Sequence, residues 1–223
     1  MSGLPTKMAK LTNSIGTHDG TFHCDEVLAC YMLKQLPEYR DADIVRTRDA
    51  TLLDKCDIVV DVGGTFSHET KRYDHHQRSF TDSYHSLVPG KRWTTKLSSA
   101  GLVYVHYGQQ IVQAIMRETA LGISSEQVEE VFDRVYDDFI EEIDAVDNGV
   151  AQTDEAPRYR VSTTLSKRVG YLNPRWNEEN IDISERFYVA MAMAGAEFRN
   201  RIKYYQHGWL PARDLVKKAV DNR

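Results

Sequence analysis

Short apolar runs alternate with stretches of helical spacing in the first third of the chain. Residues 11–15 form an apolar run, and residues 26–36 then carry apolar side chains three or four positions apart, which predicts a helix that the following proline ends. We expect short strands at 43–47 and 57–62, the second being a β-branched apolar run before two glycines, as in a buried parallel strand. This alternation predicts an α/β fold in which helices flank a parallel sheet.

The later part of the chain is mainly helical by the same criterion. After an irregular polar stretch at 67–96, a helix capped by Ser98 or Ser99 is expected to run to about residue 115. Ser125 caps another helix, whose apolar stripe has steps of three or four residues. The stripe consists of Val128, Val131, Val135, Phe139 and Ile143. Further helices are expected at about 162–172, 183–206 and 211–221.

Composition and charge change after the Asn148-Gly149 pair. Residues 150–223 hold 13 Lys and Arg against 9 Asp and Glu, a balance of +4, and the net charge of −5 then leaves −9 for residues 1–149. Acidic surface is usually only solvated surface, and the alternative is that carboxylates gather around cations. With a polar, proline-containing stretch at 154–157 as a linker or hinge, we expect a first domain at 11–150 and a helical extension at 151–223.

Composition also removes several classes of protein. The chain is 41% hydrophobic and 27% charged, and it has no run of about 18 apolar residues, so neither a disordered chain nor a membrane span is expected. The N-terminal residues lack the apolar segment of a secretory signal. Three cysteines without a CxxC pair favour a reducing compartment and small buried side chains over a disulfide framework.

Histidines concentrate in the predicted α/β part. Five of the eight fall within residues 18–76. Among them, Asp74-His75-His76 places two adjacent histidines behind an aspartate, outside any apolar period. A solvent-exposed polar loop is the plain alternative for this triplet taken alone, but the other histidines and aspartates of the same region favour a chemical role.

Asp61 lies at the carboxyl end of the buried apolar strand, where open α/β sheets bind their ligands. A carboxylate buried there without partners would cost several kcal/mol, so we expect partners; a turn or capping role is the alternative. His18, His23 and Asp25 lie around the first strand-to-helix turn, at the same sheet edge. His23 and Asp25 alternate in sequence and can point the same way in an extended turn.

Asp147 is the next member of the apolar stripe that ends at Ile143. An aspartate on a core-facing stripe at a helix C-terminus opposes the helix dipole, so it is expected to be paired or bound to a cation. Asp144 lies one position round from Ile143 and is the weaker candidate. Carboxylates with neutral imidazoles suit divalent Mn, Fe, Co or Zn better than Mg alone. Two ions about 3.5–4 Å apart, bridged by Asp61, would clamp a phosphate for in-line attack.

The residues around these positions resemble the DHH phosphoesterase superfamily, named for the triplet at 74–76, and within it the eukaryotic Myg family. The stretches that carry the resemblance are GTHDGTFHCDEVLACYML, EYRDADIVRTRD, CDIVVDVGG, RYDHHQRSF, TKLSSAGLVY, EEIDAVDNG, LNPRWN and YYQHGWLPARDLV. They run from about residue 14 to the end. The resemblance implies a DHH-phosphoesterase-like fold and a 3′→5′ exonuclease acting on RNA ends, in nucleus and mitochondria.

Carried over residue by residue, the superfamily pattern implies two metal positions that share one aspartate. The ligands of the first would be His18, His23 and Asp61. Those of the second would be Asp25, Asp61, His75 and Asp147. His76 would face the scissile phosphate, and Asp74 would orient a neighbouring histidine.

The sequence departs from the superfamily in two respects. His23 stands where most members have an aspartate, which makes Mn²⁺ the first choice for the two divalent ions, ahead of Mg²⁺ or Zn²⁺. Family members also continue well beyond residue 223 into a second domain that grips substrate. We therefore expect this chain to be a catalytic domain with a helical extension, weaker on RNA than a full-length protein.

Basic and aromatic side chains supply candidate substrate contacts. Arg78 is the favoured one, because a guanidinium matches phosphate geometry. The others are Lys91, Arg92, Lys96, Arg158 and Arg160, each of which is more often a solvated surface residue. Tyr159, Tyr171 and Trp176 interleave with arginines and could stack on single-stranded RNA, but the core face of a helical segment is the favoured interpretation.

Three functions stay open on the sequence alone. The leading hypothesis is metal-dependent phosphodiester hydrolysis at RNA ends. The second keeps the metal ions but acts on a small phosphoanhydride or a short nucleotide. The third is a non-catalytic interaction module stabilised by metal.

Overall fold

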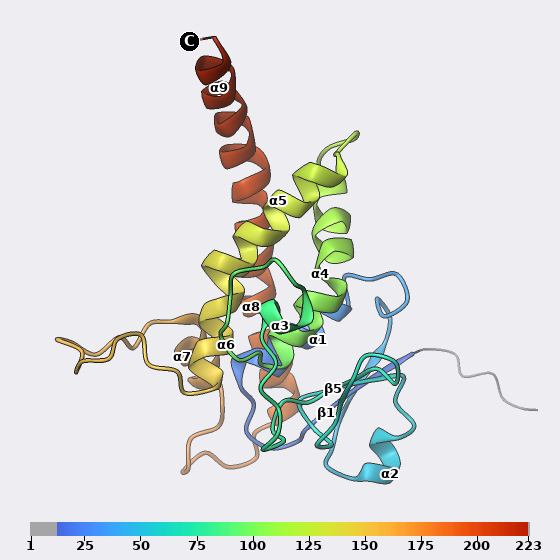
Figure 1. Ribbon diagram of the computed structural model, residues 1–223. Helices are drawn as coiled ribbons and strands as arrows, with labels where there is room; N and C mark the ends of the chain where they lie inside the picture. The colour runs from blue at the N-terminus through green and yellow to red at the C-terminus, as the bar shows by residue number, and fades with distance from the viewer. Residues whose placement is uncertain (1–12, 223) are drawn as a thin grey trace, which may run out of the picture.

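A computed structural model describes residues 13–222 and contains a five-stranded sheet beside a group of helices (Figure 1). The strands are β1 (Ser14–Thr17), β2 (Asp43–Arg46), β3 (Ile58–Val60), β4 (Phe66–Ser67) and β5 (Arg72–Tyr73), in the spatial order β2-β1-β3-β5-β4. All neighbours pair in parallel except β4, which runs antiparallel to β5. The predicted α/β fold with a parallel sheet is confirmed. Residues 1–12, including the start of the predicted first domain and the N-terminal segment, lie outside the described part.

Two of the predicted strands match β2 and β3 closely, while several short elements escaped prediction. The stretch expected to be irregular at 67–96 contains β5 and the single-turn helix α3 (Tyr84–Leu87), and α2 (Ala50–Leu53) precedes β3. These elements are two to four residues long, which is too short for a periodic pattern to show. β5 matters most, because Val60 pairs with Tyr73 and so brings the segment after Asp61 beside the segment after Tyr73.

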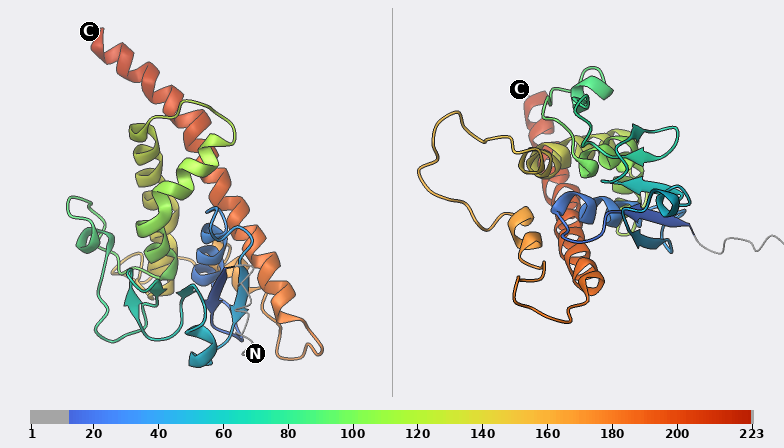
Figure 2. Two further views of the ribbon diagram at one scale, coloured as in Figure 1. Left: turned by 90° about the vertical axis from the view of Figure 1, so that its right-hand side faces the viewer. Right: turned by 90° about the horizontal axis from the view of Figure 1, so that it is seen from below.

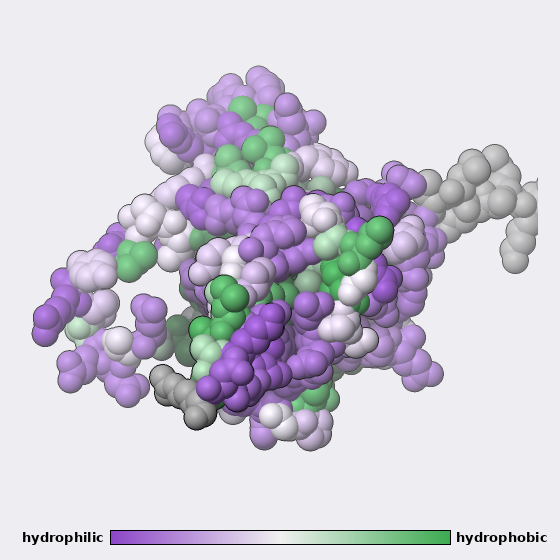
Figure 3. Space-filling model, turned by 90° about the horizontal axis from the view of Figure 1, so that it is seen from above, coloured by the Kyte–Doolittle hydropathy of each residue, from purple (hydrophilic) through white to green (hydrophobic). Residues whose placement is uncertain are grey.

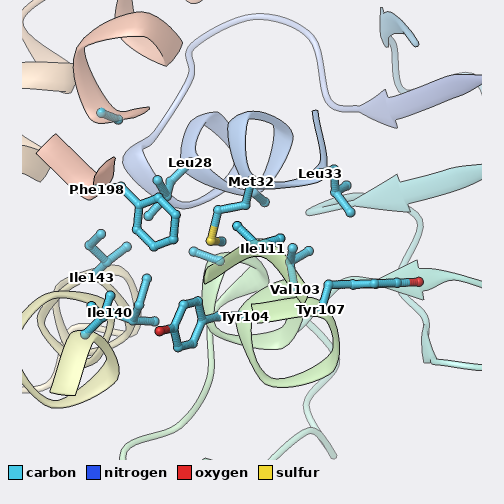
Figure 4. Packing of buried hydrophobic residues seen from close by; sticks show 14 of the residues in the cluster. Leu28, Met32, Leu33, Val103, Tyr104, Tyr107, Ile111, Ile140, Ile143 and Phe198 are labelled. Carbon is cyan, nitrogen blue, oxygen red and sulfur yellow. The ribbon is translucent and has the colours of Figure 1, made fainter. Parts of the chain in front are cut away.

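The helices α1 (Cys24–Leu33) and α4 (Ser99–Arg117) face each other in the core beside the sheet (Figure 4). Met32 of α1 lies beside Ile111 of α4, and Leu28 of α1 lies beside Phe198; all four are fully buried. α4 begins where predicted, because the Ser98 hydroxyl accepts a hydrogen bond from the backbone N–H of Gly101. Cys24 is the first residue of α1, two positions earlier than expected.

The predicted apolar stripe lies on three consecutive helical segments. They are α5 (Ser125–Val135), the π-helical turn η1 (Tyr136–Ile140) and α6 (Glu141–Asp147). Repeated steps of four residues drift around a helix of 3.6 residues per turn, and a π turn absorbs the surplus. The stripe therefore stays on the core as far as Ile143, which is 2% exposed.

The last helices are α7 (Leu165–Gly170), α8 (Ile183–Tyr204), the π turn η2 (Tyr205–Trp209) and α9 (Leu210–Asp221). The first three pack on the same core, whereas α9 buries Leu210 alone. The expected break between 206 and 211 is absent, because the π turn η2 continues α8 directly into α9, and Pro211 lies just after this turn. α9 projects beyond the other helices (Figures 1 and 2). The division into domains at residue 150 stays a prediction.

The surface of the described part is mainly polar and carries one long exposed loop. Residues 148–164 hold no helix or strand and run as an extended loop away from the other elements (Figure 2). Seen from above, the surface is mainly hydrophilic, with apolar residues in small separate groups (Figure 3).

Within the described part, no helix has the length and apolar character needed to cross a bilayer. Cys24, Cys30 and Cys56 are buried and free, as predicted.

Candidate metal centre

Asp61 occupies the centre of a buried group of carboxylates and imidazoles. Its backbone has φ 59°, in the left-handed region that non-glycine residues rarely adopt, and two glycines with positive φ follow at Gly63 and Gly64. This turn aims the side chain inward. Its Oδ2 lies 3.3 Å from His18 Nε2, and its Oδ1 lies 3.2 Å from His75 Nε2. One carboxylate thus faces a histidine on each side.

His18 follows the last residue of β1 and lies between two acids. Its Nε2 is 3.2 Å from Glu26 Oε1, and its Nδ1 is 3.0 Å from the Asp19 carbonyl. Burial lowers the pKa of His18, but the hydrogen bonds to Asp61 and Glu26 outweigh it and raise the pKa to about 10. His23 is the N-cap of α1, and its backbone N–H donates to the Glu26 carboxylate. This hydrogen bond fixes the Glu26 carboxylate close to both His18 and His23.

His75 faces the opposite side of Asp61. Its Nε2 lies 3.2 Å from Asp147 Oδ2 and 3.7 Å from Asp25 Oδ2. Burial, together with the charges of Asp61 and Asp147, holds the pKa of Asp25 well above its usual range. These carboxylates repel one another, so the assembly calls for positive charge.

The donor atoms fall into three overlapping groups, within each of which all atoms lie within 4.8 Å of one another. The groups are His18, His23, Glu26 and Asp61; Asp61, His75 and His76; and Asp25, His75 and Asp147. Within the described residues, the buried Oδ1 of Asp25 and Nδ1 of His75 have no hydrogen-bond partner. Unsatisfied buried atoms are costly, and imidazole nitrogens with carboxylate oxygens are a donor set for transition metals. The residues therefore fit divalent cations.

Asp74 holds His76 at the edge of this group. Asp74 Oδ1 accepts from His76 through both the backbone N–H, at 3.0 Å, and Nδ1, at 2.8 Å. Its Oδ2 accepts from the backbone N–H of Gly64 at 2.6 Å. The hydrogen bond to Asp74 raises the pKa of His76, whose side chain is 63% exposed and faces the cleft.

The start of α4 supports the buried carboxylates. The backbone N–H of Ser99 donates to Asp25 Oδ2 at 3.3 Å, and its hydroxyl lies 2.9 Å from the Tyr73 carbonyl and 3.2 Å from Asp61 Oδ1. Asp144, the weaker metal candidate, is fully buried and has a different task. It accepts from the N–H and hydroxyl of Ser98 and from the Tyr136 hydroxyl, and it belongs to none of the three donor groups.

The donor groups open into a cleft of about 690 Å³. The predicted site residues that line it are His23, Asp25, Asp61, His75, His76, Asp147 and Lys96. The far wall is formed by α7 and the residues after it, including Lys167, Tyr171 and Asn173. Asn173 ties this wall to the turn before α1, because it accepts from the backbone N–H of Phe22 at 2.9 Å and donates to the Phe22 carbonyl at 2.7 Å.

The structure does not bring most of the predicted basic contacts to the cleft. Lys91 Nζ lies 2.7 Å from the Asp133 carboxylate and Arg92 pairs with Asp137, both at the surface of the helix 125–147 and outside the cleft lining, so substrate binding by these two stays a prediction that the cleft does not support. Arg78 is exposed and does not line the cleft. Arg158 and Arg160 lie in the exposed loop that precedes α7.

The favoured interpretation of the aromatic residues as a core face is wrong. Tyr159 is 77% exposed, Tyr171 67% and Trp176 97%, because all three lie outside the helices. Of the three, Tyr171 alone lines the cleft.

Sequence reasoning missed four residues of the site, and one of them carried a signal. Glu26 stands three positions after His23, which is the spacing of a capping box, and this would have placed its carboxylate at the helix start. His23 and Asp25 do not share an extended turn as expected, because α1 begins at Cys24, and they join different donor groups. Ser99, Lys167 and Asn173 depend on tertiary contacts that no local pattern encodes.

Comparison with known sequences identifies relatives. The model of one family, MYG1_exonuc, described as an uncharacterised protein family (UPF0160), matches residues 14–223. A MYG1 exonuclease of Homo sapiens is 55% identical over 212 residues, which cover 94% of this chain and 55% of the relative. The Mus musculus MYG1 exonuclease is 54% identical, with 94% and 54% covered, and a MYG1 protein of Saccharomyces cerevisiae is 37% identical, with 96% and 64% covered.

The chain thus spans about half the length of the mammalian relatives. No solved structure matches it. Since the family model covers nearly the whole chain, from the first described strand to the last residue, the chain belongs to the MYG1 exonuclease family.

Proposed function

We propose that this chain carries the metal-binding site of a phosphodiesterase that removes nucleotides from RNA ends, with two divalent ions, Mn²⁺ by preference. The observation that carries the proposal is the position of Asp61, whose two oxygens face different histidines and which belongs to two donor groups, one with His18, His23 and Glu26 and one with His75 and His76. A carboxylate shared in this way suits a dinuclear site of the DHH phosphoesterase kind. His18, His23, Glu26 and Asp61 would hold one ion, and Asp25, Asp61, His75 and Asp147 the other.

Divalent ions bound there would supply Lewis-acid activation of water and of a phosphoryl oxygen. The chain's own residues do the rest. Asp74 keeps Nδ1 of His76 occupied, which leaves the other ring nitrogen of this exposed histidine free for a phosphate in the cleft. Glu26 fixes the His23 backbone, and Ser99 fixes Asp25 and Asp61, so that the donors are preorganised before substrate binds.

Nuclease activity is supported by the names of the mammalian relatives, which are called exonucleases. The preference for Mn²⁺ rests on the histidine content of the donor groups, because imidazole is a poor ligand for Mg²⁺. Specificity for RNA and the 3′→5′ direction rest on the resemblance described above.

The test compares Asp61→Asn with Asp41→Asn, in the full-length protein. Asp41 is an exposed aspartate just before β2 and does not line the cleft. Bound Mn²⁺ is counted by mass spectrometry after gel filtration, and hydrolysis is followed on a 5′-labelled oligoribonucleotide and on pyrophosphate. Asp61→Asn should lose bound metal and at least about a hundredfold of RNA hydrolysis, while Asp41→Asn retains both.

Three results would count against the proposal. Full hydrolysis by Asp61→Asn would mean that the site lies elsewhere. Cleavage of pyrophosphate without cleavage of RNA would favour a small-substrate hydrolase. Metal binding without hydrolysis of either would favour a metal-stabilised interaction module.

A further inference from the structure

The cleft contains two lysines that come from segments far apart in the sequence. Lys96 precedes α4, and Lys167 lies in α7. Neither ammonium forms an ion pair with any residue between 13 and 222, although Lys91 and Arg92, only a few positions before Lys96, are both paired with aspartates. The cleft therefore keeps two positive charges available to a ligand.

The two lysines reach the cleft from different walls. Asn148, the residue after Asp147, donates to the Lys96 carbonyl at 2.9 Å, which puts Lys96 on the side of His75 and Asp147. Ser166, the residue before Lys167, lies beside Cys24, which stands between the donors His23 and Asp25. Lys167 therefore belongs to the wall opposite the segment that carries Lys96, and both lysines line the cleft into which the donor groups open.

The wall that carries Lys167 is fixed in place. Leu165 and Val169 of α7 are buried in the core, and Arg168 forms a bidentate pair with Glu197 of α8. Asn173 binds both backbone polar groups of Phe22. Because α7 is held from three directions, Lys167 is a built-in part of the cleft wall, although its side chain is exposed.

We infer that Lys96 and Lys167 bind phosphates next to the phosphate held at the donor groups, so that the cleft engages a chain of phosphodiesters. This rests on the proposed function and names the residues with which its site would hold the neighbouring phosphates. An ammonium group binds phosphate as a point charge, without demanding one geometry, which suits a flexible single strand. Tyr171, exposed at the same wall, offers a ring on which a base can stack. Inorganic polyphosphate has no base and would gain nothing from this ring.

The test measures binding of a fluorescein-labelled eight-nucleotide oligoribonucleotide to the full-length protein by anisotropy, in EDTA, across a range of KCl concentrations. Each of Lys96→Ala and Lys167→Ala should weaken binding about fivefold, and the double variant should lower the slope of log K against log[KCl] by about 1.4, or about 0.7 for each phosphate that is no longer neutralised. Tyr171→Leu should weaken binding about tenfold without changing the slope. Lys218→Ala, exposed on α9, is the matched control and should bind as the wild type does.

The inference is overturned if both lysine variants bind the oligonucleotide as tightly as Lys218→Ala does. It is also overturned if tripolyphosphate competes as well as unlabelled oligonucleotide while Tyr171→Leu has no effect, because the cleft would then read phosphate chains alone. Either result leaves the metal content and hydrolysis of the Asp61 variants as they are. Failure of this inference is therefore distinguishable from failure of the proposed function.

Discussion

Asp74 Oδ1 lies 2.8 Å from His76 Nδ1, at the boundary between the buried donor groups and the open cleft. The same carboxylate is anchored from behind by the backbone N–H of Gly64. His76 therefore cannot turn its ring without losing a charged partner. This pair connects the strand end at Asp61 with the cleft, since His76 Nδ1 is also 3.5 Å from Asp61 Oδ1.

The first prediction concerns Asp74→Asn. Asp74 raises the pKa of His76, so its replacement by a neutral amide lowers that pKa. If protonated His76 contacts the phosphate, the alkaline limb of the pH–rate profile should move to lower pH, with bound metal unchanged. Asp82→Asn, on the surface segment before α3, serves as the control. An unshifted limb would remove His76 from the reaction.

The second prediction concerns the pH dependence of the metal-free protein. The folded pKa of His18 is raised to about 10, so protonated His18 stabilises the metal-free fold fully below about pH 6.5, and this contribution is lost as the pH rises toward 10. A metal ion must displace this proton, so Mn²⁺ affinity should rise with pH, by up to about tenfold per unit between pH 6.5 and 8.5. Calorimetric titration at several pH values measures the slope. An affinity independent of pH would show that no proton leaves His18.

The third prediction concerns Asp144, which holds the start of α4. Replacement by alanine leaves the N–H and hydroxyl of Ser98 and the hydroxyl of Tyr136 without their acceptor in a fully buried place. We expect a loss of about 3 kcal/mol in the free energy of unfolding, measured by urea denaturation. Asp144→Asn keeps an acceptor oxygen and should lose much less. Equal losses in the two variants would mean that charge, rather than hydrogen bonding, decides the stability.

The fourth prediction concerns the contact between α8 and α1. A Cβ atom at Gly195 would lie 2.1 Å from the Tyr31 ring, whereas one at Gly208 would have its nearest neighbour 3.9 Å away. Gly195→Ala should therefore destabilise the protein by about 1–3 kcal/mol through overpacking. Gly208→Ala should be neutral or stabilising, because alanine is the better helix former. Thermal unfolding of both variants gives the comparison. A stabilised Gly195→Ala would mean that α8 shifts freely on α1.

The structure brings together most of the donor residues predicted from the sequence, but few of the predicted substrate contacts. Asp61 and His18 could be placed together because the carboxyl ends of parallel strands share one sheet edge, whereas the triplet at 74–76 was assigned by resemblance because β5 is too short to be predicted. Asp147 could be reached along the stripe from Val128, although the π turn that keeps it in register was not foreseen. In each case a periodic backbone element transmits the position.

The basic residues show where that reasoning stops. Lys91, Arg92 and Lys96 are basic residues of the same polar stretch. Aspartates on the helix 125–147 pair with Lys91 and Arg92, whereas Lys96, within the described residues, stays unpaired in the cleft. Lys167 reaches the cleft because Leu165 and Val169 fix α7 in the core. Which surface charge finds a partner depends on the folded arrangement, and spacing along the chain does not encode it.

Whether Asp61 is shared between two metal positions can be seen by anomalous scattering at the manganese edge, from crystals grown with Mn²⁺. We expect two peaks that both contact the Asp61 carboxylate, one on the side of His18 and one on the side of His75. A single peak, or two peaks of which one does not contact Asp61, would show that Asp61 is not shared.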